Sequence, residues 1–208
     1  MLIVGLTGTV ASGKNFVSDL FEKLGAAVFD ADKEVHEIFR KNIKVFAQIK
    51  KHFPEVIFED KIDRKKLGTL VFNNQEKLEI LEKIVHPIVK KRRENFIKKT
   101  RKQGKQIIIL NIPLLFEKKI HLNCDKNILV TAPKLIQKQR FLEREKSKIS
   151  NPDINLLIAK FEDILQNQIP NSKKEKWVDF IIKNGKNESF TLKQVIKIFN
   201  KLSKNDGK

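Results

Sequence analysis

Short apolar runs separated by helical periodicities are the main pattern of this chain. The run at residues 2–6 is continuous and brief, which is typical of a strand buried on both faces. Between it and the next run, apolar residues recur at helical spacing up to Gly25, a common helix stop. The pattern predicts five strands, at residues 2–6, 26–29, 106–110, 126–131 and 178–182.

The segment 33–103 differs because it shows helical patterns and no convincing strand. The predicted helices cover 33–52, 64–72, 75–85 and 87–103. Pro87 would stand in the first turn of the last of these, a position that proline tolerates. The segment therefore reads as a helical insertion between the second and third strands.

Helices also follow the fourth and fifth strands. They are predicted from Pro133 to a break at Ser150-Asn151-Pro152, from Pro152 to Gln166, and from a capping box at Thr191 and Gln194 to about Leu202. Strands that alternate with helices favour parallel pairing and a sheet covered on both faces. We therefore expect an α/β fold with an open parallel five-stranded sheet.

Composition limits the possible classes of protein. A chain of 208 residues fits one domain. No apolar stretch approaches the roughly 20 residues of a membrane helix, and the N-terminus lacks a secretory signal pattern. The single cysteine, Cys124, fits a reducing compartment. We expect a cytoplasmic protein without a membrane partner.

The formal net charge of +18 has two readings, a generally basic solvated surface or a face that binds polyanions. The lysines are scattered in pairs such as Lys50-Lys51 and Lys173-Lys174, without a long run of like charge. Tyrosine is absent and the phenylalanines stand in apolar runs, so no base-stacking pattern is present. We expect no nucleic-acid partner and a monomer.

A phosphate-binding pattern follows the first predicted strand. Gly8, four further residues, Gly13 and Lys14 match the P-loop, in which backbone N–H groups at a helix N-terminus surround phosphate oxygens and the lysine reaches the β and γ phosphates. Ala11 and Ser12 keep the loop narrow. The alternative is an ordinary turn between a strand and a helix.

The residue after the lysine breaks the pattern, because Asn15 stands where Ser or Thr normally ligates Mg²⁺, and Phe16 follows it. An amide oxygen is a suitable hard ligand but reaches about one bond further than a hydroxyl, and a shift near 1 Å at a reacting centre costs about 100-fold in rate. Alternatively, Asn15 caps or lines the helix while water completes the metal shell.

Two carboxylates, Asp30 and Asp32, follow the second strand on the edge where open sheets bind ligands. One of them can cap the next helix, and the other can accept a proton from a substrate hydroxyl. We favour Asp30 as the cap and Asp32 as the chemical group. Glu117 ends another apolar run and is either a site residue or a solvated acid at a helix start.

Other candidates have simpler alternatives. Leu115 and Phe116 read as core or pocket wall, and His86 as a lone structural histidine. Arg140 and Arg144 lie one helical turn apart, which suits a lid closing over ATP or a plain solvated face.

Taken together, these segments resemble the dephospho-CoA kinase family over nearly the whole chain. The matching segments are GLTGTVASGK at 5–14, DAD at 30–32, DRKKLGTLVF at 63–72, LEKIVHPIV at 81–89, PLLFE at 113–117, Gln137 with Arg140 and Arg144, QIP at 168–170, and Asn184. The resemblance implies phosphorylation of the ribose 3′-hydroxyl of dephospho-CoA by MgATP, giving CoA and ADP.

The resemblance also implies roles for parts of the chain. The core would comprise 1–32, 104–137 and 171–208, with a CoA-binding insertion at 33–103 and a lid at 138–170. Residues 8–14 would hold the ATP phosphates with Lys14 as a catalytic residue, and Asn15 and Phe16 would extend the nucleotide site. Asp32 would be the general base and a substrate contact. The lid arginines Arg140 and Arg144 would contact ATP, and the substrate side would include His86, Leu115, Phe116 and Glu117.

The chain departs from the family pattern at several positions. Asn15 and Phe16 replace the usual Ser/Thr pair, and Asn111 stands where Asp is frequent. Lys90 and Ile164 stand where arginine is common. These changes leave two other hypotheses open, another small-molecule P-loop kinase or a non-catalytic protein that binds nucleotides or polyanions.

Overall fold

The protein contains a five-stranded sheet in the order β2-β5-β1-β6-β7. The computed structural model describes residues 1–72, 74–148 and 151–204. Parallel pairing places Leu6 of β1 opposite Asn111 of β5 and Ile128 of β6. The strands are β1 (Leu2–Thr7), β2 (Ala27–Asp30), β5 (Ile107–Asn111), β6 (Lys126–Thr131) and β7 (Phe180–Lys183). The prediction of an open parallel five-stranded sheet is confirmed.

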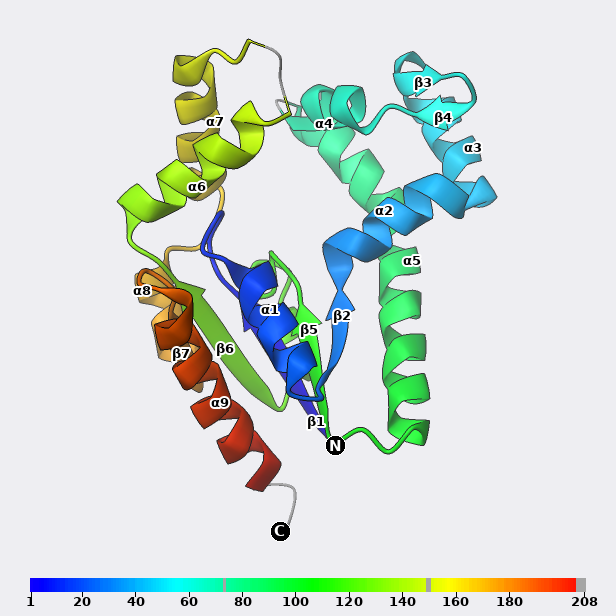
Figure 1. Cartoon of the computed structure of the whole chain (residues 1–208). Helices are drawn as coiled ribbons and strands as arrows, with labels where there is room; N and C mark the ends of the chain where they lie inside the picture. The colour runs from blue at the N-terminus through cyan, green and yellow to red at the C-terminus, as the bar shows by residue number, and fades with distance from the viewer. Residues whose placement is uncertain (73, 149–150, 205–208) are drawn as a thin grey trace. The chain divides into compact units, whose positions relative to one another are not determined.

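Helices α1 (Lys14–Lys23) and α9 (Glu188–Lys204) pack against one face of this sheet (Figure 1). Alternate strand residues such as Val4 and Leu6 face these helices and are fully buried. Gly5, between them, faces the opposite side, where a Cβ atom would lie 2.6 Å from the Leu115 side chain. The strand thus needs glycine at this position so that Leu115 can pack directly on the sheet.

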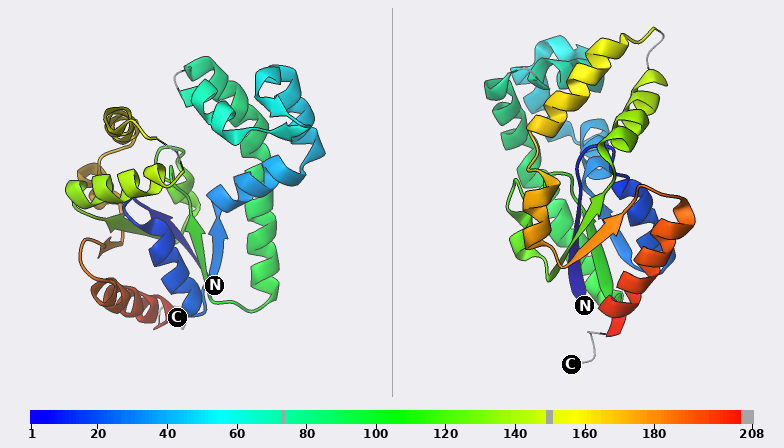
Figure 2. Two further views of the ribbon diagram at one scale, coloured as in Figure 1. Left: turned by 45° about the horizontal axis from the view of Figure 1, so that its top comes forward. Right: turned by 90° about the vertical axis from the view of Figure 1, so that its left-hand side faces the viewer.

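The chain divides into two compact units, residues 30–99 and the remainder of the described chain. The first unit, 1–29 with 100–204, contains the sheet and the helices that follow β6 and β7 (Figure 2). Its other helices are α6 (Lys134–Lys146), α7 (Ile154–Gln166) and α8 (Asn171–Lys174), with 3-10 turns at Ile120–Asn123 and Glu175–Trp177.

The second unit is mostly helical around its own core of Ile38, Ile49, Phe53 and Leu67, which are at most 2% exposed. It contains α2 (Ala31–Lys41), α3 (Ile43–His52), a 3-10 turn at Pro54–Val56, β3 (Ile57–Phe58), β4 (Lys61–Ile62), α4 (Arg64–Phe72) and most of α5 (Gln75–Lys102).

Three sequence expectations in this unit were wrong. The predicted helix 33–52 is two helices, because Asn42 leaves helical geometry and its side chain accepts a hydrogen bond from Val45 N at 3.1 Å. A small hairpin, β3–β4, turns through Glu59 and Asp60, both with positive φ. Pro87 lies inside α5 and starts no new helix.

The start of the last helix also differs from the prediction. Helix α9 begins at Glu188, and the Asn187 side chain accepts a hydrogen bond from Phe190 N at 2.9 Å as its cap. Thr191, expected to be the cap, is fully buried inside the helix and bonds to Asn184. Asn187, four residues earlier, is therefore the N-cap in place of Thr191. Of the expected break at Ser150-Asn151-Pro152, Ser150 lies outside the described residues, and Asn151 and Pro152 lie outside any helix, before α7 begins at Ile154.

Candidate active site at the phosphate-binding loop

The loop between β1 and α1 has the turn that a phosphate-binding loop needs. Ser12 N donates to Thr9 O at 3.1 Å, and Ala11 and Gly13 have positive φ of 55° and 89°. Helix α1 begins at Lys14, so the loop leads directly into the helix N-terminus. This is the arrangement in which backbone N–H groups and the helix dipole favour an anion.

The two loop glycines are required by close packing. A Cβ on Gly8 would lie 2.5 Å from both Ser12 Oγ and Val130 O. A Cβ on Gly13 would overlap Asn184 Nδ2. Neither position has room for a side chain.

We expect Gly13→Ala to lower both stability and nucleotide affinity. A left-handed backbone alone costs an L-residue about 1–2 kcal/mol, and the clash with Asn184 adds to this because Asn184 is held on several sides. Denaturant unfolding and an ADP titration measure the two effects. Gly25→Ala is the matched control, since Gly25 has φ 103° with nothing near its Cβ position. Equal effects in the two variants would contradict the packing argument.

Asn184, directly after β7, joins the loop to three other segments. Its Nδ2 donates to Ser12 O at 2.9 Å, and its Oδ1 accepts from Thr191 Oγ1 at 3.0 Å. Its backbone N donates to Thr131 O at 2.7 Å, and its backbone O accepts from Arg140 Nη1 at 3.0 Å. With 4% exposure, Asn184 is a buried support of the loop.

The opposite side of the loop is held by amide side chains near α6 and α7. Thr9 Oγ1 donates to Gln137 Oε1 at 3.0 Å, and Val10 N donates to Gln168 Oε1 at 2.9 Å. Asn171 Nδ2 donates to Thr9 Oγ1 at 3.4 Å. The segment that joins α7 to α8 therefore helps to fix the loop, and a movement of that segment would alter the hydrogen bond from Val10 N to Gln168.

Asn15 lies in the first turn of α1 and is exposed. Its Oδ1 accepts a hydrogen bond from Asn111 Nδ2 at 3.0 Å. Asn111 is the last residue of β5 and is 2% exposed. Two positions at which the chain departs from the family pattern are thus in direct contact.

The two predicted lid arginines have different surroundings. Arg140, on α6, bonds to Asn184 O, and its Nη1 is 3.5 Å from the Cβ position of Gly13. It therefore stands beside the loop. Arg144 Nε is 3.3 Å from Glu145 Oε1, and its guanidinium lies over the Phe141 ring. Contact of either arginine with ATP stays a prediction.

Glu145 links α6 to α7. Its carboxylate accepts from Lys148 Nζ at 2.7 Å and lies 3.4 Å from Lys160 Nζ on α7. Partial burial raises the pKa of Glu145, but the hydrogen bond from Lys148 and the charges of Lys148, Lys160 and Arg144 outweigh it and leave this pKa below its usual value. The link is therefore present at neutral pH and is lost as the pH falls through the lowered pKa.

Glu117 occupies a buried ion pair. Its Oε1 is 2.9 Å from Lys174 Nζ and accepts from Ile169 N at 3.0 Å. The Lys174 side chain is completely buried and that of Glu117 is 13% exposed. Glu117 therefore anchors the chain between α7 and α8, and its predicted contact with substrate stays a prediction.

Leu115 and Phe116, which precede this glutamate, lie in the core. Leu115 is 0% exposed and Phe116 is 3% exposed. The Phe116 ring stacks on His121 at 4.3 Å between centroids. Substrate contact through these two side chains also stays a prediction.

In the second unit, Asp30 caps α2 as expected, since its side chain accepts from Lys33 N at 3.0 Å. Asp32 is exposed in the first turn of α2, two residues after β2. His86 is exposed on α5, 4.0 Å from Glu82. The structure thus assigns the cap of α2 to Asp30 and not to Asp32.

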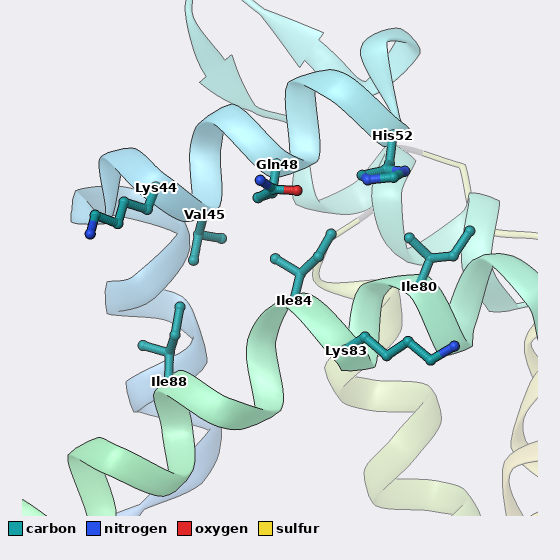
Figure 3. A pocket seen from close by; sticks show the side chains of 8 residues that line it. All are labelled: Lys44, Val45, Gln48, His52, Ile80, Lys83, Ile84 and Ile88. Atoms are coloured by element: carbon teal, nitrogen blue, oxygen red, sulfur yellow. The ribbon is translucent and has the colours of Figure 1, made fainter.

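The second unit also has two grooves. One, about 460 Å³, lies between α3 and α5, with Val45, Ile84 and Ile88 facing it and Lys44 and Lys83 at its sides (Figure 3). The other, about 420 Å³, combines aromatic and cationic residues. It is lined by His36, Phe39, Arg40, Lys41, Asn42, Ile43, Phe46, Asp60, Lys61, Ile62 and Arg64.

Sequence reasoning assigned no role to Asn184, Gln168 or Asn171, although they are the supports of the loop. Asn184 carried one usable signal, because it is a polar residue directly after a strand that ends at the ligand edge of the sheet. Gln168 stands in the QIP segment that matches the family pattern, but nothing in the sequence links it or Asn171 to loop partners about 160 residues away.

Comparison with known proteins decides the family. The family model described as dephospho-CoA kinase matches residues 2–189. This chain belongs to the dephospho-CoA kinase family. A dephospho-CoA kinase of Bartonella quintana (strain Toulouse) is 42% identical over 205 residues, which are 99% of this chain and 100% of that protein. The predicted resemblance is confirmed.

Solved structures agree with the membership of the dephospho-CoA kinase family. A dephospho-CoA kinase from Campylobacter jejuni has a TM-score of 0.62 and 27% identity, covering 97% of each chain. The Thermus thermophilus protein TT1252 has a TM-score of 0.78 and 28% identity, covering 96% of each chain. The fold of this chain is thus the fold of solved proteins over nearly its whole length.

Proposed function

We propose that this chain transfers the γ-phosphoryl group of ATP to the ribose 3′-hydroxyl of dephospho-CoA, forming CoA and ADP in the last step of coenzyme A biosynthesis. The hydroxyl oxygen forms the new bond to the γ phosphorus while the bond to the β–γ bridging oxygen breaks, and the hydroxyl proton goes to a base. The observation that carries the proposal is the glycine loop built into the start of α1 in a chain of this family.

The ATP phosphates would be held by residues 8–14. Lys14 starts α1, where an ammonium group can neutralise charge that develops on the transferred phosphoryl group. Arg140 stands beside Gly13 and supports the same end of the nucleotide. Catalysis here is positioning and electrostatic stabilisation, which is why the loop needs its rigid amide supports.

Mg²⁺ is part of the proposal as the ion that accompanies ATP. Bound there, it supplies positive charge to the phosphate oxygens. Asn15 Oδ1 accepts one hydrogen bond from Asn111 and has a second lone pair, so it fits as a single neutral oxygen ligand. Phosphate oxygens and water would complete such a shell, as Mg²⁺ commonly retains water.

The acceptor side would use Asp32 and the second unit. Asp32 is an exposed carboxylate in the first turn of α2, and a carboxylate at this place can accept the proton of the 3′-hydroxyl. The groove lined by Arg40, Lys61 and Arg64 suits the anionic diphosphate of dephospho-CoA. We assign residues 33–103 to dephospho-CoA binding and residues 138–170 to a lid over the nucleotide.

One assay tests the acceptor directly. Purified protein with MgATP should release ADP with dephospho-CoA and show little release with AMP or UMP. Turnover with AMP or UMP alone would identify a different small-molecule kinase. ATP binding without turnover of any acceptor would identify a non-catalytic nucleotide-binding protein.

The setting of the reaction is also proposed. In the described part of the chain, no helix is long and apolar enough to cross a membrane. Cys124 is a free thiol, which suits a reducing compartment such as the cytoplasm. We keep the prediction of a monomer that acts on a small-molecule substrate, and size-exclusion chromatography with light scattering tests its oligomeric state.

A further inference from the structure

The contact between Asn15 and Asn111 has chemical consequences for the metal. Asn15 belongs to α1 and Asn111 to β5, and the two residues are 96 positions apart in the chain. Their Oδ1 and Nδ2 atoms are 3.0 Å apart. Both departures from the family pattern are therefore parts of one contact. A change at either position alters the surroundings of the other.

We propose that Asn15 and Asn111 are one coupled, neutral unit that replaces a hydroxyl–carboxylate pair, so that binding of nucleotide to this enzyme depends only weakly on Mg²⁺. The inference rests on the proposed nucleotide site at the loop. In P-loop enzymes that hold Mg²⁺ directly, a Ser or Thr hydroxyl and an aspartate share this task. Here each position offers an uncharged amide.

The two amides have complementary roles in their hydrogen bond, one as donor and one as acceptor. Asn111 donates through Nδ2, and Asn15 accepts through Oδ1, which keeps the Asn15 oxygen directed by its partner. An aspartate at position 111 could only accept when ionised, so it would turn the Asn15 amide to donate and would withdraw the oxygen from a cation. A threonine at position 15 would place its oxygen one bond closer to the backbone and lose reach toward Asn111.

Because Asn111 is buried, the stability of the pair depends on whether position 111 carries a charge. Asn111 is 2% exposed, so a carboxylate at this place would lose most of its hydration. A divalent cation would compensate such a charge, whereas a neutral amide needs hydrogen-bond partners but no countercharge. The native pair is therefore stable without metal, and a carboxylate variant should need metal.

A double-mutant cycle tests the coupling. ADP affinity is measured by calorimetry with saturating Mg²⁺ and with EDTA for the native protein, Asn15→Thr, Asn111→Asp and the double variant. We expect Mg²⁺ to change the ADP affinity of the native protein by less than about tenfold. In the double variant, the effect of Mg²⁺ on ADP affinity should exceed the combined effects of the two single variants by about tenfold, or ~1.4 kcal/mol, which is within the range for residues in contact. Additive effects, or a strong Mg²⁺ dependence in the native protein, would overturn the proposal.

Thermal unfolding gives a second readout that does not depend on turnover. Asn111→Asp should unfold at a lower temperature than the native protein in EDTA, and Mg²⁺ with ADP should recover more of the loss in the double variant than in this single variant. Equal recovery would contradict coupling.

If Asn111→Asp does not fold, Asn15→Ala and Asn111→Ala form the cycle. The double alanine variant should then lose no more ADP affinity than either single variant, and additive losses of ADP affinity would overturn the proposal. Absence of ADP binding in every protein, with or without metal, would instead contradict the proposed function.

Discussion

Asp32→Asn should lower kcat by about 10²–10⁴-fold, the usual contribution of a positioned general base. Asparagine has nearly the same size but cannot take the proton of the 3′-hydroxyl. Because Asp32 is exposed and the cap of α2 is Asp30, we expect the fold to be kept. ATP affinity should change little, since Lys14 and the loop belong to the other unit. Steady-state kinetics and an ATP titration measure both quantities.

Asp30→Asn is the matched control for this experiment. Asp30 caps α2 through a bond from Lys33 N, and asparagine caps helices about as well as aspartate. This variant should therefore keep both stability and turnover. Retained turnover in Asp32→Asn would reject the base assignment, and equal losses in the two variants would show that the negative charge of this segment matters in general.

Lys174→Met should lower the free energy of unfolding by about 3–5 kcal/mol, because removing one partner of a buried ion pair leaves an uncompensated charge. Lys174 is fully buried 2.9 Å from Glu117 Oε1. Without it, the Glu117 carboxylate would keep the hydrogen bond from Ile169 N and lose its countercharge. For a chain of this length we expect the melting temperature to fall by about 10 °C.

Two further variants separate the ion pair from other effects of the substitution. Lys173→Met changes an exposed neighbour and should cost little. Glu117→Gln combined with Lys174→Met removes both charges while keeping an acceptor for Ile169 N, so it should be more stable than Lys174→Met alone. A loss in Lys174→Met no larger than in Lys173→Met would show that the pair is not a stabilising anchor.

The sheet was predictable because each strand is a short, mostly apolar run, and the runs of β1, β5 and β6 are largely buried. The errors arose at helix boundaries, where more than one nearby residue could begin or end the helix. Asn42 ends one helix and caps the next, Asn187 caps α9 in place of Thr191, and Pro87 is carried inside α5. In each case several polar or restricted residues suited a boundary, and periodicity alone could not choose among them.

The glycine loop was predictable for a different reason, since its residues are consecutive and their spacing reflects one ligand. Its supports were not predictable. Asn184 reaches Ser12 across 172 positions, and Gln168 reaches Val10 across 158. Such pairs depend on how β7 and α8 return to the sheet edge, which only the folded chain specifies. The Asn15–Asn111 contact belongs to the same class, because each residue alone looked like an isolated departure.

The supports of the loop share one chemical property with a practical consequence. Asn184, Gln137, Gln168 and Asn171 hold residues 9–12 through carboxamide groups. Carboxamides do not ionise in the range over which enzymes are assayed, unlike histidine or carboxylate supports. These direct hydrogen bonds to the loop should therefore persist from acidic to alkaline buffer. A change of rate with pH in this protein would then arise outside these direct contacts, in the substrates, in the proton acceptor or in ionisable groups further from the loop.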